Sequence, residues 1–138
     1  WTGQSLEVLA KDPLWEQVQH HPSGVTFPGG ESMALVQTRA IGAIRRWNRR
    51  LGDAATYVAV SHGDVIKAIL ADALGMHLDL FQRIQIDPCS ISVIRYTPGR
   101  AFVARVNDIG GDLRMFSPGR RPRSDRPSDA VVGGETGV

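Results

Sequence analysis

Apolar residues recur every three or four positions in two long segments of the chain. The first such set comprises Met33, Val36, Ala40, Ile44, Trp47 and Leu51. This spacing places them on one face and predicts a helix that Gly52 and Asp53 close. The same period over Val65 to Leu74 predicts a second helix that stops at Gly75.

Weaker signals predict three shorter helices. Ser5 is a suitable N-cap residue for a helix at the start of the chain, and Pro13 suits the first turn of the next one. Residues His77 to Arg83 predict a short helix later in the chain.

Between the two long helices the period changes. Tyr57–Val60 is continuously apolar, which is typical of a strand buried on both faces of a parallel sheet. A strand, a tight turn and a long helix make half of a βαβ unit, so the fold class is α/β. Ile91 to Tyr96 and Ala101 to Val106 flank Pro98-Gly99 and predict a hairpin.

Composition fits one folded domain over residues 1–111 within the 138-residue chain. Neither a membrane-spanning run nor a secretory signal is visible, so a cytoplasmic location is expected. The single cysteine, Cys89, excludes an internal disulfide framework and is expected to be a semi-buried, unreactive thiol.

Residues 112–138 are rich in Gly, Pro, Ser, Arg and Asp and are predicted to be a disordered tail. Much of the excess of basic over acidic residues lies there, in Arg114, Arg120, Arg121, Arg123 and Arg126. Acidic residues are scattered among these arginines, so we do not expect a nucleic-acid partner, although a basic tail that binds nucleic acid remains an alternative.

The most informative site candidate is Ser61-His62-Gly63, at the end of the predicted strand. Ligands of open α/β sheets gather at the carboxyl ends of strands, and the following helix N-terminus suits a phosphate. His62 therefore either contacts a phosphoryl group or merely caps the helix, and the residues leave both open. A nucleophilic Ser61 is disfavoured, because the Gly-x-Ser-x-Gly pattern is absent.

Two other polar stretches have ordinary explanations. In Gly29-Gly30-Glu31-Ser32, an acidic side chain favoured by the helix dipole precedes a capping serine. His20 and His21 are adjacent and diverge, so no metal site is predicted. His77 is expected at the surface.

Taken in order, these stretches resemble the histidine phosphatase superfamily, the phosphoglycerate-mutase-like enzymes. The matching stretches are Trp1-Thr2-Gly3, Pro28 to Ser32 with Arg39, Val60 to Gly63 with Ile66, and Asn107-Asp108. The resemblance covers roughly residues 1–113 and is closest to an actinobacterial subgroup of probable phosphomutases or phosphatases. It implies a three-layer α/β/α sandwich with a mostly parallel sheet.

The resemblance also implies phosphoryl transfer through a phosphohistidine on an Arg-His-Gly motif. His62 matches the second family histidine, which contacts the phosphoryl group, with Ser61 and Gly63 beside it. Glu31 and Ser32 match a motif near the substrate. The implied substrate is a small-molecule phosphate ester, with no metal, cofactor or membrane partner, and a homo-oligomer is left open.

The departures concern the start of the chain. It contains no Arg-His-Gly and begins at Trp1 rather than methionine, so we expect a fragment that lacks a strand beside Tyr57–Val60. Exposed apolar surface, an unpaired edge and poor solubility should follow, and the chain alone should be inactive. The alternative is a non-catalytic interaction module that retains half of the fold.

Overall fold

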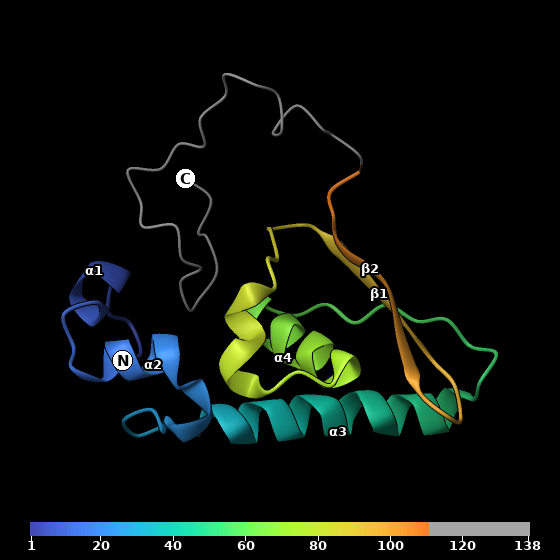
Figure 1. Cartoon of the computed structure of the whole chain (residues 1–138), viewed down its shortest axis with the longest axis horizontal. Coiled ribbons are helices and arrows are strands. Elements are labelled where there is room, and N and C mark those ends of the chain that lie inside the picture. Colours follow the sequence, from blue (N-terminus) through green and yellow to red (C-terminus); the bar gives the residue numbers. More distant parts are fainter. Residues whose placement is uncertain (111–138) are drawn as a thin grey trace.

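The computed structural model describes residues 1–110, in which two long helices lie side by side (Figure 1). These are α3 (Met33–Leu51) and α4 (Gly63–Leu74). Both were predicted by the apolar period. The predicted tail over 112–138 lies outside the described residues.

Local signals set the bounds of α3. The Ser32 Oγ accepts the Leu35 N–H at 3.1 Å and satisfies one of the unpaired donors of the first turn. At the other end the Gly52 N–H donates to the Asn48 carbonyl at 3.0 Å, and Gly52 has a φ of 80°. Glycine adopts this conformation without a steric penalty, so the helix ends as the sequence predicts.

Three short helical segments precede α3, namely α1 (Leu6–Leu9), α2 (Leu14–His20) and η1, a 3-10 turn (Pro22–Gly24). Ser5 precedes α1 in an extended conformation but makes no capping hydrogen bond, and Pro13 precedes α2. The Trp1 ring lies 6.1 Å from the Trp15 ring and 5.4 Å from Phe27. This aromatic contact joins the start of the chain to the loop before α3.

The main core lies where α4 meets η2 (Leu78–Arg83) and the hairpin. Its buried members are Met33, Ala68, Leu70, Ala71, Leu78, Phe81, Ile84 and Ile86. Phe81 is fully buried and is the largest of them. Ile94 and Val103 on the hairpin pack against this cluster and attach the sheet to the helices.

The predicted hairpin is present as β1 (Ile91–Tyr96) and β2 (Ala101–Asp108), which pair in antiparallel fashion. Tyr96 lies opposite Ala101, and the Thr97 N–H donates to the Arg100 carbonyl at 3.0 Å across the turn. The second strand extends two residues beyond the predicted end at Val106.

Asn107 attaches the end of this hairpin to the segment that leads into β1. Its Oδ1 accepts the Asp87 N–H at 2.7 Å, and its Nδ2 donates to the Asp87 carboxylate at 2.7 Å. Asn107 has a φ of 56°, in the left-handed region that asparagine tolerates better than most residues.

The prediction of a buried strand at Tyr57–Val60 was wrong for the described part of the chain. The segment takes no strand hydrogen bonds, and the side chains of Val58 and Val60 are 87% and 94% exposed. Such a strand needs neighbouring strands along its edges and helices over its faces, and within residues 1–110 the sheet has only the two antiparallel strands of the hairpin. The expected exposed apolar surface is present at Val58 and Val60.

Cys89 also differs from expectation. It is exposed rather than semi-buried and has a φ of 62°. The residue lies in the turn before β1, and this turn directs its side chain away from the core.

Candidate functional site

His62 stands at the point where the extended segment enters α4. It is the N-cap residue, with φ −95° and ψ 157°, and its carbonyl accepts the Ile66 N–H at 3.0 Å. Its side chain makes no capping hydrogen bond, and no hydrogen bond or ion pair joins it to another of residues 1–110. Ser61 and His62 are both exposed. The imidazole is therefore open to a ligand from outside the described chain, and it does not cap the helix.

The start of α4 carries a charged pair that the sequence did not reveal. Asp64 lies in the first turn, and Lys67 is buried, with its side chain 4% exposed. The Lys67 Nζ donates to the Gln82 Oε1 at 2.9 Å and lies 3.8 Å from the Asp64 carboxylate. A buried ammonium needs such partners, so this contact links the start of α4 to η2. The available signal was a lysine within the apolar run from Val65 to Leu70.

Glu31 and Ser32 each accept hydrogen bonds from residues of α3. The Arg39 Nε donates to the two Glu31 carboxylate oxygens at 2.9 and 3.0 Å, and its Nη2 donates to one of them at 2.7 Å. The Arg39 hydrogen bonds lower the pKa of the Glu31 carboxyl below its ordinary value, despite an opposing desolvation effect, and Arg39's charge adds to the lowering. Ser32 caps α3, which is the ordinary explanation given by the sequence.

A groove of about 650 Å³ lies between α3, the extended segment and α4. Its lining includes Ser61, Tyr57 and Trp47, with Arg39 and Arg46 among the polar residues. The structure thus brings Ser61 to the same groove as Arg39, whose guanidinium holds Glu31. The lining does not include His62, so the groove and the imidazole are neighbouring features of the described chain rather than one pocket.

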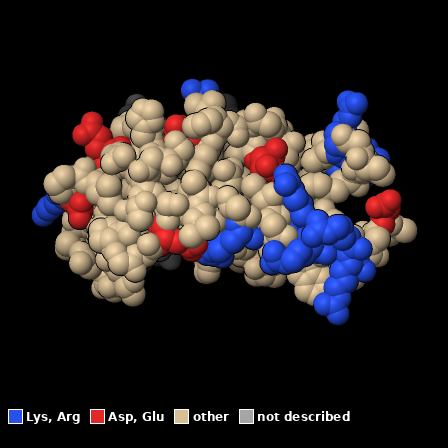
Figure 2. All heavy atoms as spheres, turned by 90° about the horizontal axis from the view of Figure 1, so that it is seen from below, with Lys and Arg blue, Asp and Glu red and all other residues tan. Residues whose placement is uncertain are grey.

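Positive charge gathers on one face of the molecule, over the C-terminal half of α3 (Figure 2). The exposed arginines of this half are Arg45, Arg46, Arg49 and Arg50. Arg45 pairs with Asp72 at 3.5 Å, and the Arg50 guanidinium lies 5.2 Å from the centre of the Trp47 ring. The remaining positive field attracts anions toward this side of the groove.

Within residues 1–110, no group of three or more His, Cys, Asp and Glu side chains is arranged to hold a metal ion. None of the helices in that range combines the length and the apolar character needed to cross a membrane.

Comparison with known families identifies the fold to which these features belong. The model of the histidine phosphatase superfamily (branch 1) matches residues 1–109. The chain belongs to this superfamily. The resemblance found in the ordered motifs is therefore confirmed, and with it the α/β class.

Among curated proteins, this histidine phosphatase chain is 32% identical over 114 residues to phosphoserine phosphatase 1 of Hydrogenobacter thermophilus. The alignment covers 78% of this chain and 51% of that protein. It is also 31% identical over 115 residues to a bifunctional protein of Mycobacterium tuberculosis, covering 80% of this chain and 30% of the relative. The chain thus spans about half the length of the first relative and less than a third of the second.

Proposed function

We propose that the chain contributes the His62 side of a phosphoryl-transfer site in a phosphate monoester hydrolase or phosphomutase. The reaction would proceed through a phosphohistidine on an Arg-His-Gly motif, which these 138 residues do not contain. One observation carries the proposal. Within a chain matched by the histidine phosphatase model over residues 1–109, His62, the residue that resembles the family's second histidine, has an exposed imidazole without a capping hydrogen bond at a helix N-terminus.

The chemistry of phosphoryl transfer gives each proposed residue a role. Negative charge is spread over the equatorial oxygens of the transferring group, and positioned donors lower the barrier by stabilising it. His62 would donate to one oxygen, while Gly63 and the positive end of the α4 dipole would face the group from the backbone. The Ser61 hydroxyl would be a further donor. No metal or cofactor is invoked.

Glu31 and Ser32 would act at the substrate side of this site. Glu31 is held by Arg39, and Arg39 shares the groove with Ser61. We propose that this pairing sets the position of the loop against a small-molecule phosphate ester. The name of the Hydrogenobacter thermophilus relative, phosphoserine phosphatase 1, makes phosphoserine the first substrate to test.

The proposed whole domain is a three-layer α/β/α sandwich in which Tyr57–Val60 becomes a central strand. The exposed Val58 and Val60 side chains and the unbonded backbone support this arrangement, because a neighbouring strand and a covering layer would satisfy both. We further propose a cytoplasmic enzyme and leave self-association to measurement.

The decisive experiment begins with the reading frame before the codon for Trp1. If that frame encodes Arg-His-Gly, the longer protein should hydrolyse phosphoserine or another phosphate monoester, and the 138-residue chain alone should not. His62→Ala in the longer protein should lower turnover by about 10²–10³, as removal of a charge-stabilising donor does in other enzymes. His20→Ala is the matched control, because His20 is exposed and lies on α2. Near-normal turnover of His62→Ala would refute the assignment.

A second candidate function is a non-catalytic interaction module. The absence of Arg-His-Gly from the 138 residues, together with the exposed apolar edge at Val58 and Val60, favours it. A frame without the motif, combined with a protein that binds a partner through this edge and hydrolyses no phosphate ester, would establish the module and exclude the enzyme.

A further inference from the structure

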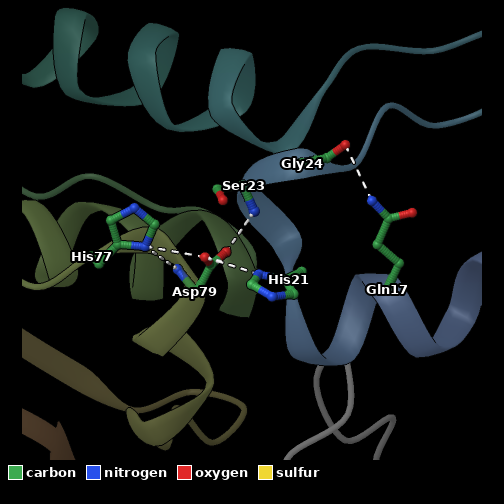
Figure 3. Close-up of polar contacts among 6 residues, drawn as sticks. All are labelled: Gln17, His21, Ser23, Gly24, His77 and Asp79. Carbon is green, nitrogen blue, oxygen red and sulfur yellow. Dashed lines mark hydrogen bonds and ion pairs between the residues drawn. The ribbon is translucent and has the colours of Figure 1, made fainter.

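Asp79 joins parts of the chain that are far apart in sequence (Figure 3). Its Oδ1 accepts the Ser23 backbone N–H at 2.8 Å, and its Oδ2 lies 3.3 Å from the His21 Nδ1 and 3.2 Å from the His77 Nδ1. The Asp79 side chain is 17% exposed, whereas those of His21 and His77 are 77% and 67% exposed. A largely buried carboxylate thus lies between two exposed imidazoles.

This contact anchors the base of the loop that carries Glu31. The loop over residues 25–32 begins two residues after Ser23, and it is closed by hydrogen bonds from the Met33 N–H to the Val25 carbonyl at 3.1 Å and from the Phe27 N–H to the Glu31 carbonyl at 3.2 Å. These hydrogen bonds tie the loop to its own base. The contact that holds Ser23 against η2 therefore also sets the position of Glu31.

The charge of Asp79 is set by its partners in this cluster. Burial raises the pKa of the Asp79 carboxyl, but the Ser23 hydrogen bonds, the His21 hydrogen bond and the charge of His77 outweigh it and leave the pKa below its ordinary value. Asp79 therefore stays ionised near neutrality, where histidine side chains change charge. From α4, the Lys67 ammonium is directed to Gln82 and Asp64 instead, and His20 of α2 makes no contact with Asp79.

His77 can exchange one contact for another. Its Nδ1 lies 3.3 Å from the Asp79 backbone N–H, which it accepts when that nitrogen carries no proton. When Nδ1 is protonated it becomes a donor and faces the Asp79 Oδ2 instead. Protonation thus replaces a local cap of η2 with a charge-assisted hydrogen bond to the carboxylate.

We propose that Asp79 is a positioning residue, whose carboxylate fixes the loop over residues 25–32 on η2 and holds it more firmly when His21 and His77 are protonated. The attraction is strongest while both imidazoles are cationic and Asp79 is ionised. It weakens as pH rises and the imidazoles become neutral, and it is lost at low pH once Asp79 itself is protonated. The effect on turnover, although not the loop contact itself, rests on the proposed function.

Two substitutions of Asp79 separate charge from hydrogen bonding. Asp79→Asn keeps an oxygen for the Ser23 N–H and removes the charge, whereas Asp79→Ala removes both. The measurement is the protection factor of the Ser23 amide in hydrogen exchange on the 138-residue chain at pH 6 and pH 8, corrected for the intrinsic exchange rate at each pH.

In the unsubstituted chain, protection of Ser23 should be about two- to tenfold higher at pH 6 than at pH 8, the range expected for two exposed ion pairs. Asp79→Asn should retain protection but lose this pH dependence. His20→Gln removes a neighbouring imidazole that lacks the contact, so it should leave the pH dependence unchanged. Protection independent of pH in the unsubstituted chain, or normal pH dependence in Asp79→Asn, overturns the proposal. If Asp79→Ala does not fold, the Asp79→Asn comparison still decides.

The same pair of variants in the longer protein tests the link to turnover. In the unsubstituted longer protein, KM should change between pH 6 and pH 8 in parallel with the protection of Ser23. Asp79→Asn should remove this change in KM and leave kcat little altered. A longer protein that hydrolyses no phosphate ester would refute the proposed function while leaving the exchange result intact. A KM that keeps its pH dependence in Asp79→Asn would refute the link between loop and substrate alone.

Discussion

Asn107→Ala should destabilise the end of the hairpin more than the replacement of an exposed polar residue with alanine does. The change removes the acceptor of the Asp87 N–H and the donor to the Asp87 carboxylate, both at 2.7 Å. It also forces a residue with a Cβ and no compensating side-chain contact into a φ of 56°. Both losses fall on one part-buried position near the end of β2.

The size of the destabilisation follows from the lost hydrogen bonds and from the left-handed backbone conformation. A lost hydrogen bond that leaves a partly buried donor unsatisfied costs about 1–3 kcal/mol, and the left-handed conformation adds about 1 kcal/mol for alanine. We therefore expect Asn107→Ala to lower the free energy of unfolding by about 2–4 kcal/mol. Asn107→Gly loses the same contacts but fits the positive φ, so it should be less destabilised than Asn107→Ala by about 1 kcal/mol.

The assay is urea denaturation of the 138-residue chain followed by far-ultraviolet circular dichroism, with the slope of the transition compared between variants. An Asn107→Ala chain that unfolds within about 0.5 kcal/mol of the unsubstituted chain would refute the reasoning, because surface substitutions without special contacts fall within that range. Equal stability of the alanine and glycine variants would show that the backbone conformation contributes nothing.

The remaining predictions concern the Glu31 pair and the exposed edge. Because hydrogen bonds from Arg39 lower the pKa of the Glu31 carboxyl, any stability from this pair is present above the ordinary pKa and lost as pH falls through the lowered one. Arg39→Gln should raise the pKa of Glu31 in an NMR titration, Arg46→Gln should not, and an unchanged midpoint in Arg39→Gln would contradict the pairing. Val60→Lys should reduce self-association in light scattering, with stability changed by less than about 0.5 kcal/mol, since this side chain is 94% exposed beside an unpaired backbone. Association that persists unchanged would show that another surface is responsible.

Features encoded by neighbouring residues could be read from the sequence. The helix over Met33–Leu51 was predicted because its apolar period and its terminators, Ser32 and Gly52, are local signals. The hairpin followed in the same way from two short apolar runs around Pro98-Gly99. His62 was located at the helix start by the same local logic, although its role remains a proposal.

Features that depend on distant residues could not be read in this way. Tyr57–Val60 has the composition of a buried strand, but burial requires neighbouring strands and covering helices that composition does not supply, and within residues 1–110 no strand pairs with the segment. The contact between Ser23 and Asp79 joins positions 56 residues apart, and no periodic signal marks it. The exposure of Cys89 arose from a left-handed turn conformation that the neighbouring Pro88 and Ser90 did not indicate.

The distribution of the core along the chain has a consequence for the order of folding. Except for Met33, every buried member of the main cluster lies between residues 68 and 86, and the hairpin that covers it follows directly. Contacts between near neighbours close short loops, so they form early and at little entropic cost. We therefore expect α4, η2 and the hairpin to assemble first, with the N-terminal helices docking on them in a later, slower step.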